Sequence, residues 1–134
     1  MSKNIATTIS EYNHLQPVEI KEVCNFLEVQ INKYLKKSEP KIWHGSPVWF
    51  IDENPIVSYS VRKNNSVSLM FFSGQGFGEK DLKNEGKFKA AEIFYTNVNE
   101  INKTDLKIWL KKASDIQWDY KNIVKRKGIL KRLK

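Results

Sequence analysis

Residues 17–37 carry the clearest periodic pattern in the chain, with apolar positions three and four residues apart. This spacing places them on one face of an α-helix, so we expect an amphipathic helix that packs on a core. Pro17 suits its first turn, and Lys36 and Lys37 lie where the helix dipole favours cations. The apolar positions are Ile20, Val23, Cys24, Leu27, Ile31, Tyr34 and Leu35.

Strand-like alternation follows a segment rich in aromatic residues, Trp43 to Phe50, which leads through a turn. One side of each alternating segment is apolar, while the other is largely small and polar. That pattern is typical of an antiparallel sheet with one face on a core and the other partly wet. The segments are residues 56–62, residues 66–72 and about residues 88–98, and Asn64-Asn65 gives the first two a turn composition.

A second helical pattern runs from about Lys103 to Lys127, with Asn102 or Thr104 available as its N-cap. Its apolar stripe is Leu106, Trp109, Leu110, Ala113, Ile116, Tyr120, Ile123 and Val124. The order of helix, strands and helix predicts an α+β fold. We expect an antiparallel sheet of about four to five strands, flanked by an N-terminal helix and a long C-terminal helix.

The size of the chain, 134 residues, suits one domain spanning residues 1–134. Hydrophobic residues make up 40% of it, which favours an ordered globule over a disordered chain. The sequence contains neither a long apolar run nor a signal-like N-terminus, so we expect a soluble, cytoplasmic protein without a membrane span. The single cysteine, Cys24, lies on an apolar stripe and is interpreted as a small buried hydrophobic residue.

The formal charge of +8 is concentrated at one end. Residues 1–124 have a net charge of +2, whereas residues 125–134, the basic tail, contain no acid. Such a tail attracts polyanions with little selectivity, although a solvated helix end that favours solubility explains the same pattern. The candidate polyanion-binding residues are Lys125, Arg126, Lys127, Lys131, Arg132 and Lys134.

Aromatic residues concentrate around the turn and the predicted sheet edge, in a number greater than a small core needs in one region. Rings that line a concave site would stack on a flat or apolar ligand, with polar neighbours to orient it. Core packing remains the alternative for each ring, and a structural role remains the alternative for the lone histidine. The candidate ligand-binding residues are Trp43, His44, Ser46, Trp49, Tyr59, Phe72, Gln75 and Phe77, of which Phe77 is expected to be exposed.

Two motif blocks point to a family. The first is Trp43-His44-Gly45-Ser46-Pro47-Val48-Trp49, and the second joins Phe71-Phe72, a glycine-bearing loop, Leu82, Glu85-Gly86-Lys87-Phe88 and Asp105-Leu106. With these blocks the chain resembles the YdhG-like domains of unknown function over roughly residues 17–115. The resemblance implies a small α+β fold with a closing helix.

Some YdhG-like proteins are described as frataxin-like intracellular iron chaperones, so the resemblance also implies iron binding and delivery. Iron is therefore a candidate ligand, with Glu19, Glu22 and His44 as candidate metal-binding residues. A continuous ridge of carboxylates would suit iron better, because hard cations prefer oxygen ligands. Here Lys21 lies between Glu19 and Glu22, and the charge pattern favours solvated surface charges over a metal site for both glutamates.

The residues therefore favour a binding protein over an enzyme, because no catalytic constellation accompanies the aromatic segment. A hydrolase or transferase is the weaker alternative, since it would need a hydrogen-bond partner for His44. We expect a small molecule or a metal ion to bind near the turn. The alternative is a protein or nucleic-acid interaction module that uses the basic C-terminal helix. Deleting residues 128–134 is expected to distinguish the two, because only the second needs the tail.

Overall fold

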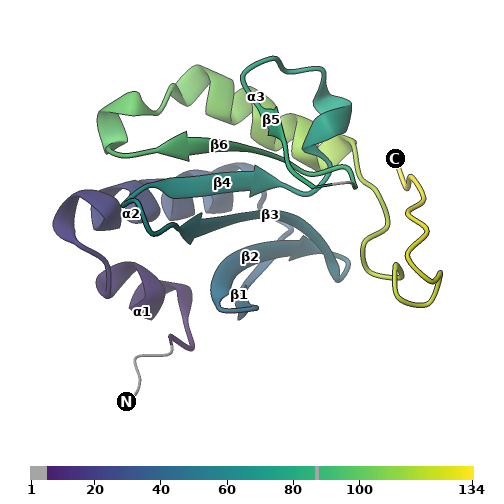
Figure 1. Ribbon diagram of the computed structural model, residues 1–134, viewed down its shortest axis with the longest axis horizontal. Helices are drawn as coiled ribbons and strands as arrows, with labels where there is room; N and C mark the ends of the chain where they lie inside the picture. The colour runs from purple at the N-terminus through teal and green to yellow at the C-terminus, as the bar shows by residue number, and fades with distance from the viewer. Residues whose placement is uncertain (1–5, 87) are drawn as a thin grey trace.

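The computed structural model describes residues 6–86 and 88–134, so Lys87 of the second motif block lies outside the described residues. The chain forms an α+β fold of helices and an antiparallel sheet (Figure 1). The helices are α1 (Ile9–His14), α2 (Val18–Tyr34) and α3 (Lys103–Asp115), with short 3-10 helices η1 (Gly74–Phe77) and η2 (Val98–Glu100). The strands are β1 (Glu39–Trp43), β2 (Ser46–Ile51), β3 (Asn54–Val61), β4 (Val67–Phe71), β5 (Lys83–Asn84) and β6 (Ala91–Tyr95).

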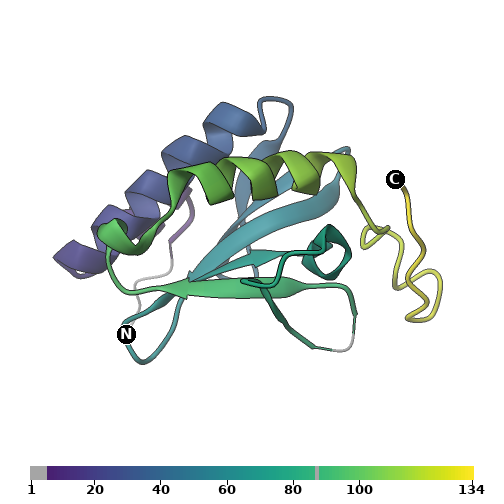
Figure 2. The same ribbon diagram turned by 90° about the horizontal axis from the view of Figure 1, so that it is seen from above.

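The sheet has the strand order β1-β2-β3-β4-β6-β5, and each neighbouring pair is antiparallel. Helices α2 and α3 lie side by side across one face, so the protein has two layers (Figure 2). Within residues 6–86 and 88–134, no helix of comparable length covers the other face. The predicted α+β fold is confirmed, and the described residues form six strands, one or two more than expected.

The core lies between this helix pair and the sheet. The apolar stripe of α2 is buried as its spacing predicts, and Cys24 is fully buried within it. This burial confirms the expected small buried hydrophobic residue, and it raises the pKa of the Cys24 thiol to about 12. On the sheet, the alternating positions Val57, Tyr59, Leu69 and Phe71 meet the helices.

The C-terminal half of the predicted long helix is wrong, because α3 ends at Asp115. Its start is confirmed, since the Asn102 side chain accepts a hydrogen bond from the backbone N–H of Asp105. Beyond Asp115 the body offers partners that a continuing helix would not reach. The backbone N–H of Trp118 donates to Ser73 Oγ, and that of Lys121 donates to Asn54 Oδ1.

Residues 117–134 instead form an irregular hairpin, which we name the C-terminal hairpin. Its two ends pair antiparallel, with Asp119 N–H donating to the Lys131 carbonyl and Leu133 N–H donating to the Gln117 carbonyl. Trp118 and Arg132 form a β-bridge in the same ladder. The prediction of a basic C-terminal helix is therefore wrong. The basic tail, residues 125–134, lies in a non-helical hairpin at one end of the molecule (Figure 1).

Candidate functional site

A hollow of about 260 Å³ opens on the sheet face that the helices leave free. Four strand segments contribute to it, because antiparallel pairing brings alternate residues of each strand to this face. Its lining combines two aromatic rings, an imidazole, three serines and two aliphatic or thioether side chains. We name it the sheet groove, lined by Trp43, His44, Ser46, Val48, Ser58, Ser60, Met70 and Phe72.

The β1–β2 turn places the rim of the groove. His44 and Gly45 have φ angles of 53° and 80°, the left-handed conformation that two-residue hairpin turns require. The turn sets Trp43 opposite Ser46, and Trp43 remains 39% exposed. The His44 ring lies 4.1 Å from the Trp43 ring, measured between centroids. The histidine thus belongs to the rim through both its backbone and its side chain.

Serines form the floor of the groove. Register pairs Ser58 with Val48 on one side and with Met70 on the other, which brings all three to the helix-free face. Among the described residues, neither the Ser58 hydroxyl nor the Ser60 hydroxyl makes a hydrogen bond to another side chain or to the backbone. Their small size leaves the hollow, and their hydroxyl groups are free to donate to and accept from a ligand.

Aromatic contacts extend from the groove toward the C-terminal hairpin. Trp43 packs on Phe50 at 5.6 Å and on Phe72 at 6.4 Å between ring centroids. Phe72 continues to Tyr120 at 5.4 Å. The Tyr120 hydroxyl accepts a hydrogen bond from the backbone N–H of Lys89, which fixes this ring. Contacts with Phe50 and with Tyr120 therefore fix the rings of Trp43 and Phe72 in the absence of a ligand.

The structure separates the predicted ligand-binding residues into three locations. Trp43, His44, Ser46 and Phe72 line the groove. Trp49 and Tyr59 are fully buried on the helix-covered face, where Trp49 Nε1 donates to Asn32 Oδ1. The sequence could not distinguish the two sets by residue type alone.

The remaining two predicted residues lie in and around η1. The Gln75 side chain donates to the Ala90 carbonyl, so it anchors its own loop and does not face the groove. Phe77 is buried against Phe71, with ring centroids 5.5 Å apart. The expectation of an exposed Phe77 is wrong, because the 3-10 turn folds the ring back into the core.

Four groove residues were not among the predicted site residues: Val48, Ser58, Ser60 and Met70. The signal for the serines was present, because Ser58 and Ser60 alternate with the core residues Val57 and Tyr59. Alternation identified a small, polar face of the sheet. Alternation alone does not reveal the curvature of the β1–β2 hairpin, which brings Trp43 beside that face.

The predicted metal-binding residues do not form a cluster. Glu19 and Glu22 are exposed on α2, and His44 lies in the β1–β2 turn. In the part of the chain that the structure describes, no group of three or more His, Cys, Asp or Glu side chains could hold a metal ion. These residues therefore do not fit an iron site.

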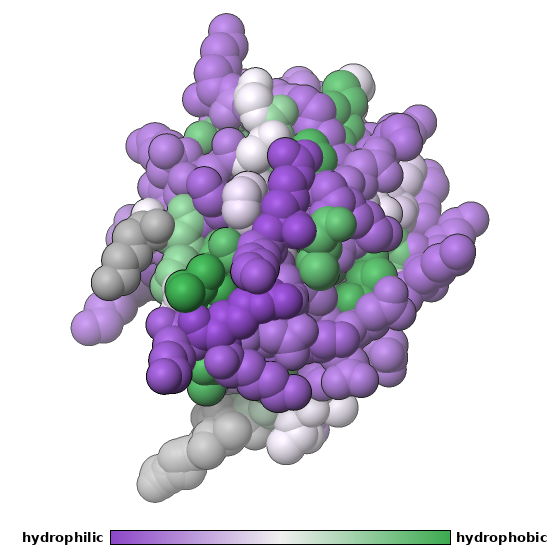
Figure 3. All heavy atoms as spheres, turned by 90° about the vertical axis from the view of Figure 1, so that its right-hand side faces the viewer, coloured by the Kyte–Doolittle hydropathy of each residue, from purple (hydrophilic) through white to green (hydrophobic). Residues whose placement is uncertain are grey.

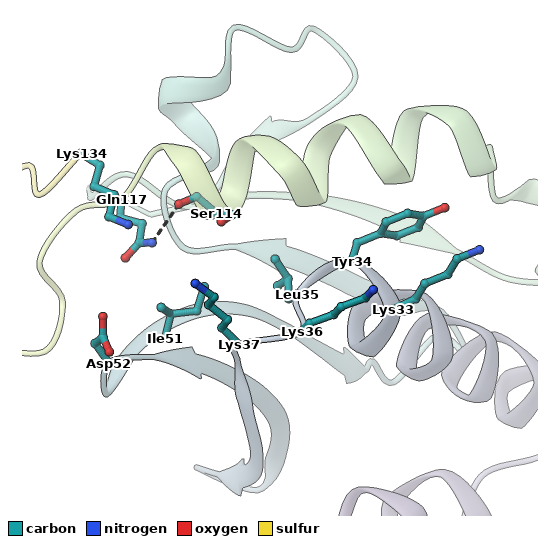
Figure 4. A pocket seen from close by; sticks show the side chains of 10 residues that line it. All are labelled: Lys33, Tyr34, Leu35, Lys36, Lys37, Ile51, Asp52, Ser114, Gln117 and Lys134. Atoms are coloured by element: carbon teal, nitrogen blue, oxygen red, sulfur yellow. Dashed lines mark hydrogen bonds between the residues drawn. The ribbon is translucent and has the colours of Figure 1, made fainter.

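A second, larger cavity of about 660 Å³ lies where the C-terminal ends of α2 and α3 meet the β2–β3 turn (Figure 4). Lys37 extends into it toward Gln117, whereas Lys33 and Lys36 extend along the end of α2. Four lysines and a single carboxylate, Asp52, line it, which makes it basic. We name it the lysine cavity, lined by Lys33, Tyr34, Leu35, Lys36, Lys37, Ile51, Asp52, Ser114, Gln117 and Lys134.

Comparisons with protein-family models, with curated proteins and with solved structures find no significant match to this chain. Among the described residues, no helix combines the length and the apolar character needed to cross a bilayer.

Proposed function

We propose that this protein binds a flat, largely apolar small molecule that carries one or two hydrogen-bonding groups, and that it does so in the sheet groove. The observation that carries the proposal is the pairing of an aromatic rim, the exposed Trp43 and the partly buried Phe72, with the hydroxyls of Ser58 and Ser60, which have no hydrogen-bond partner among the described residues. Apolar walls with a few placed polar groups are typical of small-molecule sites.

The chemistry of the groove supports this ligand class. An aromatic ligand that enters beside Trp43 gains stacking and buries the exposed part of the indole. The hydroxyls of Ser58 and Ser60 then orient it from below, because each can donate and accept. His44 adds a titratable group at the rim, where it can bond to a carbonyl or a carboxylate of the ligand.

Chemical-shift mapping of isotope-labelled protein with indole and quinoline as probes tests the proposal. We expect perturbations confined to the amides of the groove. Trp43→Ala is expected to weaken probe binding roughly two- to tenfold, the contribution typical of an aromatic pair. Ser60→Leu is expected to weaken it further, because the larger side chain fills the floor.

Phe94→Ala is the matched control. Phe94 is 43% exposed and pairs with Ser68 on the same sheet face, but it does not line the groove. His44→Asn tests the imidazole without disturbing the turn, since asparagine tolerates positive φ. Equal losses in Trp43→Ala and Phe94→Ala, or perturbations spread over the core, would refute binding in the groove.

We also propose that the chain is related to the YdhG-like domains, on the strength of the two motif blocks. That relationship would suit a binding protein. Iron delivery draws no support from the positions of Glu19, Glu22 and His44, so the organic ligand is the function that the geometry supports best.

A further inference from the structure

Three large aliphatic side chains protrude from the C-terminal hairpin. Val124 is 86% exposed, Ile129 is 62% exposed and Leu133 is 51% exposed. Single exposed aliphatic residues are common on protein surfaces, but here three occur within ten residues of one hairpin. The C-terminal hairpin lies at one end of the molecule (Figure 1), and this end faces the viewer in Figure 3.

The loop that presents Val124 and Ile129 is held in shape by its own backbone. Gly128 N–H donates to the Ile123 carbonyl at 2.9 Å, and Lys127 N–H donates to the Val124 carbonyl at 3.0 Å. Lys127 and Gly128 both have positive φ, which closes the turn between the two aliphatic side chains. The aliphatic pair is therefore displayed on an ordered loop.

Asp119 anchors this loop to the hairpin. Its carboxylate accepts hydrogen bonds from Asn122 and pairs with Arg126, although the carboxylate itself is almost fully buried. The hydrogen bonds from Asn122, together with Arg126, lower the pKa of the Asp119 carboxyl, although burial opposes them. The side chain of Asn54 in turn donates to the Trp118 carbonyl and so holds the hairpin against the sheet.

Basic residues are neighbours of the exposed aliphatic residues in the sequence. Of the six basic residues in the tail, only Arg126 has an acidic partner among the described residues. The basic surface continues onto the body, because Lys134 lines the lysine cavity together with Lys36 and Lys37 (Figure 4). Figure 3 shows this end of the molecule as mainly hydrophilic with separate apolar patches.

We propose that the C-terminal hairpin docks the protein on an anionic lipid bilayer. Aliphatic side chains that insert at the boundary of headgroups and acyl chains, surrounded by lysines and arginines, are the combination that binds such a surface. Single-stranded nucleic acid would instead favour aromatic rings among the cations, for base stacking. The two aromatic rings of the hairpin, Trp118 and Tyr120, are partly buried against the body, where Lys89 lies over Trp118 and Phe72 packs on Tyr120, and no aromatic residue follows position 120. This inference is independent of the sheet groove.

Sedimentation of the full chain with vesicles tests the inference. Vesicles of phosphatidylcholine mixed with phosphatidylserine are expected to bind the protein, and vesicles of phosphatidylcholine alone are not. Lys125→Gln and Lys127→Gln are expected to weaken binding about fivefold each, the effect of one cation near an anionic membrane. Val124→Ser combined with Ile129→Ser is expected to weaken it about tenfold, through lost apolar burial.

Matched controls lie elsewhere on the surface. Val18→Ser removes a comparably exposed aliphatic side chain from α2, and Lys63→Gln removes a charge from the β3–β4 turn. Neither is expected to change vesicle binding, and unchanged melting temperatures confirm that each variant is folded.

Three results would overturn the inference. The first is a full chain that does not sediment with phosphatidylserine vesicles. The second is vesicle binding that the aliphatic double variant leaves unchanged, since that would indicate a purely electrostatic tail. The third is binding of single-stranded oligouridine at least as tight as binding to vesicles, which would assign the basic surface to nucleic acid.

Discussion

At the scale of single residues, the most demanding arrangement in the core surrounds Asn13. Its side chain is buried and makes three hydrogen bonds: it donates to Asn25 and Glu28, and it accepts from the Tyr59 hydroxyl at 2.7 Å. These bonds join α1 to α2 and to the sheet. Burial raises the pKa of the Tyr59 phenol, so this group stays a neutral donor.

Asn13→Ala is expected to lower the free energy of unfolding by about 1–3 kcal/mol, because it leaves the buried Tyr59 hydroxyl without a partner. Urea unfolding measures the loss. Tyr59→Phe in the same background should restore part of the stability, since it removes the orphaned hydroxyl. Asn25→Ala is the control, because Asn25 is exposed and shares only one bond of the network. Equal losses at Asn13 and Asn25 would contradict the argument.

At the scale of elements, the C-terminal hairpin is held in its folded form by the Asp119 carboxylate, which can be protonated at low pH. The pKa of Asp119 lies below its ordinary value of 3.8, so the docked hairpin binds fewer protons than an undocked one. Its contribution to stability is present above pH 3.8 and is lost as the pH falls through that value toward the lowered pKa. The order of the hairpin should therefore decrease when the pH falls below about 3.8.

Heteronuclear NOE values for the amides of residues 122–128 are expected to fall as the pH decreases below about 3.8, while those of α2 stay high. Asp119→Asn should show low values already at neutral pH, and they should vary little with pH. Asp115→Asn is the control, because its pair with Lys111 is exposed and contributes little. Constant NOE values in the unmodified protein across the acid range would disprove the anchoring role.

The elements also show which parts of the fold the sequence patterns could predict. Helical spacing located α2 and the start of α3, and alternation assigned Val57 and Tyr59 to one sheet face and Ser58 to the other. Spacing failed after Asp115, where Ile116 and Tyr120 continue the stripe. There the helix gives way to hydrogen bonds with Ser73 and Asn54, residues distant in sequence that no local pattern reveals.

The candidate site was predictable to the same extent. The Trp43–Ser46 turn was predicted as part of a ligand site because it concentrates aromatic and small residues in a short segment. Trp49 and Tyr59 share that composition but face the helices, since the face of a strand depends on register and sheet curvature. Phe77 depends on a 3-10 turn, which hydrophobic periodicity does not report.

At the scale of the whole molecule, the charge is distributed unevenly over the two-layer body. Residues 1–124 are nearly neutral, and the excess lies in the hairpin and continues to the lysine cavity. The sheet groove and the basic surface lie on different parts of the fold, joined through Tyr120, which contacts Phe72 from the hairpin. A change in the hairpin can therefore reach the groove through packing as well as through charge.

Deleting residues 128–134 is consequently expected to do more than remove charge. The deletion removes the Lys131 carbonyl that accepts from Asp119 and the Leu133 N–H that donates to Gln117. These two hydrogen bonds alone contribute about 1–3 kcal/mol, and the deletion also removes the Gly128 N–H that donates to the Ile123 carbonyl. We therefore expect the free energy of unfolding to fall by at least about 1–3 kcal/mol. The remaining hairpin residues should also become more mobile.

The full-length triple variant Lys131→Gln, Arg132→Gln, Lys134→Gln separates the two effects. It keeps the backbone ladder and removes three exposed charges, so its free energy of unfolding, measured in urea, should stay within about 0.5 kcal/mol of that of the unmodified protein. If the deletion and the triple variant are equally stable, the hairpin contributes no structure to the body. If only the deletion is destabilised, loss of ligand or lipid binding after truncation cannot be assigned to charge, and the triple variant becomes the test of the basic surface.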